Sequence, residues 1–201
     1  CIDLQQLHVW RDEWMEDQSW LETLRKLKAQ GKVRAIGVSI NDHEPDSALR
    51  LVESGVIDTV QVIYNIFDQA PAEQLLPACL RHDVGVLVRC PYDEGGLTGA
   101  IGPDTTFPEG DWRHHYFKGD RKAQVAAHVA PLKQLLGPEA GTLPELALRY
   151  CLAHPAVSTV IPGMRGRKHV QANCAVSDGR ALSNGLLQEL ARHAWLRTFY
   201  D

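Results

Sequence analysis

The stretch VRAIGVS, at residues 33–39, decides the fold of this chain. Its apolar and β-branched residues are typical of a buried strand. Similar stretches follow at residues 58–64 and 84–89, and the segments between these strands, 44–54 and 73–82, have the composition and end signals of helices. A repeated strand–helix order forms right-handed βαβ units, so the sequence predicts an α/β fold with a parallel sheet.

The same alternation extends toward both ends of the chain. Residues 2–9 are predicted to form a strand before a helix at 19–30. Residues 158–161 are predicted to form a strand before a helix at 167–175. We therefore expect five adjacent parallel strands.

The remaining helices are predicted from their end signals and apolar spacing. Ser19 and Thr142 each precede a glutamate at the spacing of a capping box. Residues 121–136 keep a helical spacing that Pro131 should kink or divide. A terminal helix is predicted at residues 183–195.

The rest of the chain predicts a single domain. Residues 91–119 are rich in Gly, Pro, Asp and Thr and are expected to form one long irregular loop, a kind of segment that is often functional. No linker or low-complexity tract interrupts the sequence, so residues 1–201 are interpreted as one domain. The chain begins at Cys1, without an initiator methionine, inside an expected strand, which indicates an N-terminally truncated fragment.

Composition excludes several classes of function. The 201 residues are 44% hydrophobic and 23% charged, which is typical of a globular domain. The net charge of −4, without a basic block, argues against nucleic acid as a partner. No apolar run could span a bilayer and no leader opens the chain, so no membrane association is expected. The five cysteines lack metal-ligand spacing and fit a reducing, cytoplasmic location.

Polar residues stand where the predicted strands end. In folds built from βα units, chemistry gathers at the carboxyl ends of the strands, and the convergence of several polar residues there indicates a site. The residues that end the runs are His8, Ser39, Asn41, Tyr64, Asn65, Arg89, Pro162 and Gly163, and Gln61 lies inside the run at residues 58–64.

Each of these residues also has a structural interpretation. His8 could be a hydrogen-bonded structural histidine, and Gln61 could satisfy polar groups inside a barrel. Arg89 must meet an anion, an aromatic plane or solvent to avoid a desolvation cost, so an ion pair and a ligand contact are both open. Residues 163–168 combine a glycine turn with three cations and suit either an anionic ligand or a solvated loop. His114 and its neighbour His115 are interpreted as loop residues, so no metal site is predicted.

Several motifs together resemble the aldo-keto reductase family, whose members are eight-stranded TIM barrels that bind a nicotinamide cofactor. The resemblance covers essentially the whole chain and corresponds to the family barrel from its fourth strand onward. It implies an incomplete (β/α)8 TIM barrel with about five of the eight βα units. The motifs are IDLQQLH at residues 2–8, KVRAIGVS at 32–39, VQVIYN at 60–65, GGLTG at 95–99, and VIPG at 160–163 followed by Asn173.

The resemblance implies roles for individual residues. His8 matches the active-site histidine that orients and polarises the substrate carbonyl. Ser39 and Gln61 match residues that hold the nicotinamide carboxamide, and Cys90 and Pro91 fall near the pyrophosphate. The implied cofactor-binding residues are Ser39, Asn41, Gln61, Arg89, Cys90, Pro91, Gly163, Arg165, His169 and Asn173.

Three of these positions depart from the family pattern. Asn41 stands one position later than the family asparagine. Arg89 replaces an aromatic residue that stacks on the nicotinamide, where its flat guanidinium could stack likewise. His169 replaces an arginine that some members aim at the adenosine phosphate, which leaves Arg165 for that role, while Asn173 corresponds to an amide that meets the adenine.

The resemblance implies an oxidoreductase that transfers a hydride between a nicotinamide cofactor, NADP or alternatively NAD, and a small aldehyde or ketone. The family's proton-donating tyrosine and its supporting lysine and aspartate come from the first three strands, so the fragment alone is expected to be inactive. The competing interpretation is a nucleotide-sensing regulatory subunit of the same fold with little catalysis. The natural substrate and the oligomeric state are not predicted.

Overall fold

The computed structural model describes residues 1–200, which form two compact units. The strand unit contains residues 1–63, 70–89 and 155–159. The helical unit contains residues 64–69, 90–154 and 160 onward. The single-domain organisation of the chain stays a prediction.

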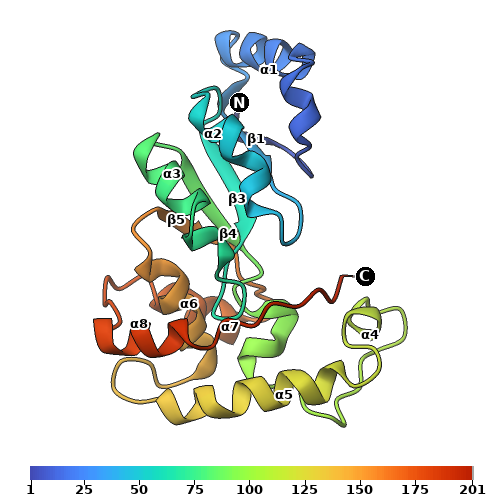
Figure 1. Cartoon of the computed structure of the whole chain (residues 1–201), viewed down its shortest axis with the longest axis vertical. Helices are drawn as coiled ribbons and strands as arrows, with labels where there is room; N and C mark the ends of the chain where they lie inside the picture. The colour runs from blue at the N-terminus through green and yellow to red at the C-terminus, as the bar shows by residue number, and fades with distance from the viewer. Residues whose placement is uncertain (201) are drawn as a thin grey trace. The chain divides into compact units, whose positions relative to one another are not determined.

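The strand unit is built on a five-stranded sheet in the order β1-β2-β3-β4-β5. The pairs β1–β2, β2–β3 and β3–β4 are parallel, which confirms the predicted βαβ arrangement. Each strand lies within one or two residues of its predicted bounds, and Figure 1 shows β1 to β4 in blue to green. The strands are β1 (Ile2–Leu7), β2 (Val33–Ser39), β3 (Thr59–Ile63), β4 (Gly85–Arg89) and β5 (Val157–Val160).

Helices pack their apolar residues against this sheet. Leu21, Leu51 and Leu75, one from each of the three helices, are fully or almost fully buried, as are Val38 and Val60 in the strands. Such burial removes apolar surface from water, which is the main stabilising contribution to the unit. The helices are α1 (Ser19–Ala29), α2 (Leu49–Glu53) and α3 (Leu75–Arg81), with 3-10 helices η1 (Asp12–Met15), η2 (Pro45–Ala48) and η3 (Ala70–Ala72).

Two helix starts in the strand unit differ from the prediction. The Ser19 hydroxyl does not cap α1; the Asp17 carboxylate accepts a hydrogen bond from the Ser19 backbone N–H at 3.0 Å instead. The carboxylate therefore takes the role predicted for Ser19, which itself forms the first residue of the helix. The helix predicted at residues 44–54 is split, since Pro45 opens a 3-10 turn and the α-helix begins only at Leu49.

The helical unit contains most of the second half of the chain. α7 has the predicted bounds, and Thr142 caps α6 by accepting a hydrogen bond from the Glu145 N–H at 3.3 Å. Pro131 does not divide α5, which continues to Leu132 before a 3-10 turn. The elements are η4 (Asp93–Thr98), α4 (Arg113–Tyr116), α5 (Arg121–Leu132), η5 (Lys133–Leu135), α6 (Leu143–Ala153), α7 (Arg167–Ala175) and α8 (Asn184–Ala191).

The segment at residues 91–119 is more regular than predicted. It contains η4 and α4, and Tyr116 and Phe117 at its end are buried. These aromatic residues provide the burial that orders the segment. The predicted terminal helix begins after Ser183, which caps α8, but ends at Ala191.

Candidate active site

The strand unit brings Ser39 and Gln61 together. The two residues are register partners on the parallel strands β2 and β3, with Ser39 as the last residue of β2 and Gln61 in the middle of β3. The Gln61 amide donates to Gln6 Oε1 at 3.0 Å, and this hydrogen bond fixes the orientation of the Gln61 side chain. Gln6 was not predicted to take part in the site, although a polar residue inside the strand at residues 2–7 is a signal for such a role.

Ser39 carries a buried hydroxyl group that has no hydrogen-bond partner among residues 1–200. The residue is 3% exposed, and its Oγ has no hydrogen bond within the described residues 1–200. A buried polar group that lacks a partner is costly and needs an explanation. A ligand amide at the end of β2 is one group that could satisfy it.

Arg89, at the end of β4, forms an ion pair inside the strand unit. One guanidinium nitrogen lies 2.5 Å from Asp42 Oδ1 and 3.1 Å from the Ile40 carbonyl oxygen. The ion pair, one of the two open interpretations, is therefore present. The sequence does not predict the role of Asp42, because a loop aspartate carries no pattern that reveals a distant partner.

Asn41 supports the loop after β1. Its amide donates to the Trp10 carbonyl oxygen at 3.1 Å and to Glu44 Oε2 at 3.2 Å. Asn41 thereby connects the loops that follow β1 and β2.

His8 lies directly after β1 and is exposed. Within residues 1–200, no group hydrogen-bonds to its ring, so the structural-histidine interpretation has no partner to support it. The neighbouring residues are tightly held: Val9 has a left-handed backbone with φ of 63°, and Trp10 is fully buried.

Trp10 anchors this loop through polar and aromatic contacts. Its backbone N–H donates to the Ser39 carbonyl oxygen at 2.7 Å, and its indole N–H donates to the Ser47 carbonyl oxygen at 3.3 Å. Its ring packs edge-on against Trp14 and Trp20, at centroid distances of 5.7 and 5.5 Å. The position of the residues after β1 is therefore determined by the core of the strand unit.

The helical unit brings together Cys90, Tyr92, Gly163 and Asn173. Tyr92 donates its hydroxyl hydrogen to Asn173 Oδ1 at 2.6 Å, and the Asn173 amide lies 3.4 Å from the Gly163 carbonyl oxygen. Pro91, between Cys90 and Tyr92, is buried. The loop after β4 is thus connected to α7, a link that the sequence did not predict.

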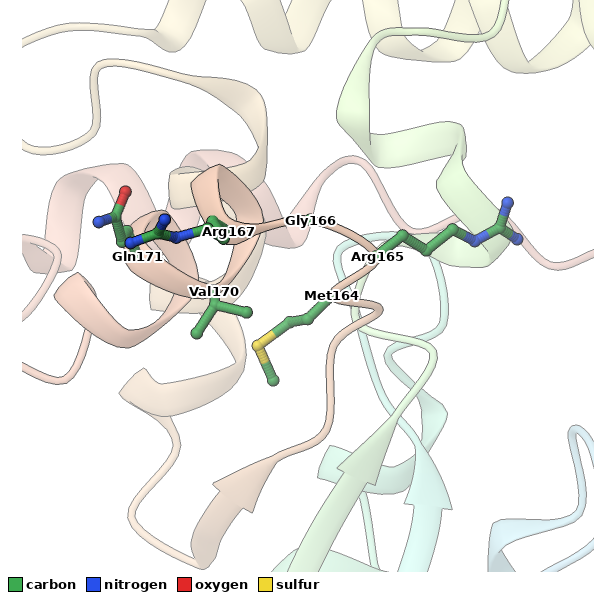
Figure 2. Close-up of a pocket in the computed structure, with 6 residues that line it drawn as sticks. All are labelled: Met164, Arg165, Gly166, Arg167, Val170 and Gln171. Atoms are coloured by element: carbon green, nitrogen blue, oxygen red, sulfur yellow. The ribbon is translucent and has the colours of Figure 1, made fainter.

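A hollow of about 380 Å³ lies at the start of α7. Figure 2 shows Met164 and Val170 facing each other, whereas Arg165 and Arg167 extend in opposite directions from the turn at Gly166. The hollow is lined by Met164, Arg165, Gly166, Arg167, Val170 and Gln171. Gly163 and His169, which neighbour these residues in the sequence, are exposed.

Arg165 lies near a carboxylate of the segment at 91–119. Hydrogen bonds from Arg113 hold the pKa of Asp111 well below its usual range, and the positive charge of Arg165 contributes to the same lowering. Arg165 is nevertheless exposed, so its guanidinium remains accessible to an anionic ligand.

Asp93 is a buried carboxyl group that the sequence analysis missed. It is 2% exposed, burial raises its pKa to about 6, and Arg197 and Tyr116 bond to its Oδ1. Among the described residues there is no cluster of three metal-ligating side chains, and no helix has the length and apolarity needed to cross a bilayer.

The chain belongs to the aldo/keto reductase family, whose model matches residues 1–193. Among curated proteins, it is 29% identical over 152 residues to the NADH-specific methylglyoxal reductase of Escherichia coli, covering 76% of this chain and 46% of that protein. It is 30% identical over 174 residues to the aldo-keto reductase YhdN of Bacillus subtilis, covering 85% of this chain and 52% of that protein. The chain thus spans about half the length of these relatives.

Solved structures agree with this assignment. The glycerol dehydrogenase AKR11B4 from Gluconobacter oxydans superimposes with a TM-score of 0.78 at 27% identity, covering 96% of this chain and 58% of that structure. The parallel sheet with helices therefore corresponds to part of a TIM barrel, which confirms the incomplete barrel implied by the sequence motifs.

Proposed function

We propose that this chain is the cofactor-binding portion of a cytoplasmic oxidoreductase that transfers a hydride between NADPH and a small aldehyde or ketone. The observation that carries the proposal is the buried Ser39 hydroxyl at the end of β2, which lacks a partner among residues 1–200 and is in register with Gln61 inside β3. Membership of the family supports hydride transfer to a carbonyl. NAD is the alternative cofactor, since one relative is named as NADH-specific.

The residues present fit a nicotinamide. A carboxamide both donates and accepts hydrogen bonds, and so do a serine hydroxyl and a glutamine amide. Ser39 and Gln61 would hold the carboxamide, and Arg89, fixed by Asp42, would lie against the ring. A bound nicotinamide supplies the hydride. His8, with its exposed imidazole, would orient the substrate carbonyl and favour proton delivery to its oxygen.

The remaining assignments belong to the same proposal. In the helical unit, Cys90 and Pro91 would lie near the pyrophosphate and Asn173 near the adenine, with Gly163, Arg165 and His169 around the adenosine. The described chain is proposed to be inactive by itself, because the family's Asp, Tyr and Lys come from strands before the matched motifs. Tight nucleotide binding without turnover in the longest form of the protein would instead favour the regulatory-subunit interpretation.

Replacing Ser39 by alanine tests the proposal. A neutral hydrogen bond contributes about 0.5–1.5 kcal/mol, so Ser39→Ala is expected to weaken nucleotide binding by ~3- to 10-fold. The melting temperature should not fall, because the hydroxyl has no partner to lose within the described residues. Binding is measured by titration and melting by calorimetry, and the exposed Ser177→Ala serves as the control. Unchanged affinity in a folded Ser39→Ala protein would contradict the proposal.

Arg165→Ala tests the preference for the phosphorylated cofactor. If Arg165 pairs with the 2′-phosphate, the substitution should weaken NADPH binding by the ~1.5–3 kcal/mol of a charge-assisted bond and leave NADH binding nearly unchanged. Both nucleotides are titrated against both proteins. An equal loss of affinity for both nucleotides would mean that Arg165 supports the loop and not the phosphate. No loss of affinity would mean that Arg167, Lys168 or His169 binds the phosphate instead.

A further inference from the structure

Residues 195–200, here called the C-terminal segment, lie beyond the family match at residues 1–193. The backbone N–H of Trp195 donates to the Phe67 carbonyl oxygen at 3.0 Å. The Trp195 ring stacks on His128 with a centroid distance of 3.7 Å and an interplanar angle of 5°. Trp195, the first residue of the C-terminal segment, therefore holds the segment against the rest of the helical unit.

Arg197 fixes the middle of the C-terminal segment. Its side chain is only 6% exposed, and its guanidinium pairs with Asp93 and, at 3.3 Å, with Asp68 Oδ2. The same guanidinium lies over the rings of Trp195 and Phe67, at 4.7 and 5.4 Å from the centroids. A buried guanidinium that lost these carboxylates would carry an uncompensated charge, so this arrangement is specific.

The partner loop, residues 90–94, has an unusual backbone. Cys90, Asp93 and Glu94 all have left-handed conformations, with φ of 52°, 49° and 53°. Non-glycine residues adopt this conformation only at a cost and keep it where surrounding contacts hold them in place.

Contacts from the C-terminal segment supply much of that support. Arg197 and the Tyr116 hydroxyl, the latter at 2.9 Å, hold Asp93. The Tyr200 hydroxyl lies 3.1 Å from Glu94 Oε1 and 3.7 Å from Cys90 Sγ, and the Cys90 thiol lies 3.1 Å from the same Glu94 oxygen. All three left-handed residues are thus bonded to residues of the C-terminal segment.

The loop at residues 90–94 contains one proposed nucleotide-binding residue, Cys90, and is hydrogen-bonded to another, Asn173. Tyr92 donates its hydroxyl hydrogen to Asn173 Oδ1 at 2.6 Å. A change in the loop backbone would therefore move Cys90 and release the Asn173 amide from the hydrogen bond that orients it.

We propose that Arg197 and Tyr200 are positioning residues, which hold the loop at residues 90–94 in the shape that receives the pyrophosphate and keeps Asn173 oriented. This inference rests on the proposed function for the identity of the ligand. The positioning of the loop itself rests only on the contacts within the helical unit.

Hydrogen exchange tests the positioning without any nucleotide. The amides of Asp93, Gly95 and Leu97 donate to backbone carbonyl oxygens of Cys90 or Tyr92 at 3.0 Å and report on the shape of the loop. In Arg197→Met, their exchange is expected to accelerate by at least ~10-fold, while amides in β2 to β4 exchange as in the wild type. Tyr200→Phe, which keeps the ring but removes the hydroxyl, is expected to cause a smaller acceleration at the same amides.

Two further variants keep the test interpretable. Arg192→Met is the matched control, because Arg192 is an exposed arginine that pairs only with Glu189 at 2.7 Å within the described residues. If Arg197→Met does not fold, the milder Tyr200→Phe and the charge-keeping Arg197→Lys decide the question. Wild-type exchange at the loop amides in either folded variant would overturn the proposal.

Nucleotide kinetics separate this inference from the proposed function. In the longest form of the protein that shows turnover, Arg197→Lys and Tyr200→Phe should raise the KM for the nucleotide several-fold with kcat nearly unchanged. A faster loop exchange with an unchanged KM would overturn the role toward the nucleotide. A wild-type protein that binds no nucleotide would instead refute the proposed function, and the exchange experiment would still decide whether the C-terminal segment positions the loop.

Discussion

Replacing His8 by alanine is expected to lower kcat/KM for carbonyl reduction by at least ~100-fold, the usual scale for a positioned acid–base group. His8 lies at the carboxyl end of β1, its ring is exposed, and it has no hydrogen-bond partner in the described part of the chain. Steady-state kinetics of the longest form of the protein with measurable turnover provide the test.

His82→Ala is the control for this experiment. His82 is also an exposed histidine of the strand unit, at the end of α3, and its replacement should leave the kinetics unchanged. If His8→Ala retained wild-type kinetics, His8 would have no catalytic role.

Trp10→Ala is expected to lower the free energy of unfolding by ~3–5 kcal/mol, the range for removing a large buried aromatic side chain. Trp10 is fully buried, packs edge-on against Trp14 and Trp20, and donates its indole N–H to the Ser47 carbonyl oxygen. Alanine would leave a cavity and an unpaired carbonyl group. Denaturant unfolding measures the difference.

Two further substitutions serve as comparisons for Trp10→Ala. Trp10→Phe keeps an aromatic ring but loses the indole hydrogen bond, so its effect should be smaller. Trp112→Ala removes a tryptophan that is 45% exposed and should cost much less. Equal losses for Trp10→Ala and Trp112→Ala would show that the burial of Trp10 does not determine how much it contributes to stability.

The regular elements were predictable because their signals are local. The strand at residues 33–39 and the helix at 167–175 have their predicted bounds, since an apolar, β-branched run marks the strand and a glycine turn ending at Gly166 precedes the helix. The segment at 91–119 was not predicted correctly because η4 includes left-handed Glu94 and Gly95, and its end is ordered by distant aromatic contacts such as Tyr116 with Phe199. Propensity alone cannot reveal such order.

The residues of the candidate site were likewise predictable only where their signal is local. The sequence singled out Ser39 as a candidate because it ends an apolar run, and Gln61 because it is a polar residue inside one. The partners of these residues were hidden by long separations along the chain. Gln6 and Gln61 are 55 positions apart, and Asp93 and Arg197 are 104 apart, so only the folded chain shows that they meet.

The distribution of tryptophans gives each unit its own optical signal. Trp10, Trp14 and Trp20 lie in the strand unit, whereas Trp112 and Trp195 lie in the helical unit. A protein with phenylalanine at positions 112 and 195 would therefore give tryptophan emission only from the strand unit. If the tryptophan emission and the far-ultraviolet circular dichroism of this one protein trace the same denaturant midpoint, the chain unfolds as one cooperative domain, and separate midpoints would mean that its halves lose structure independently.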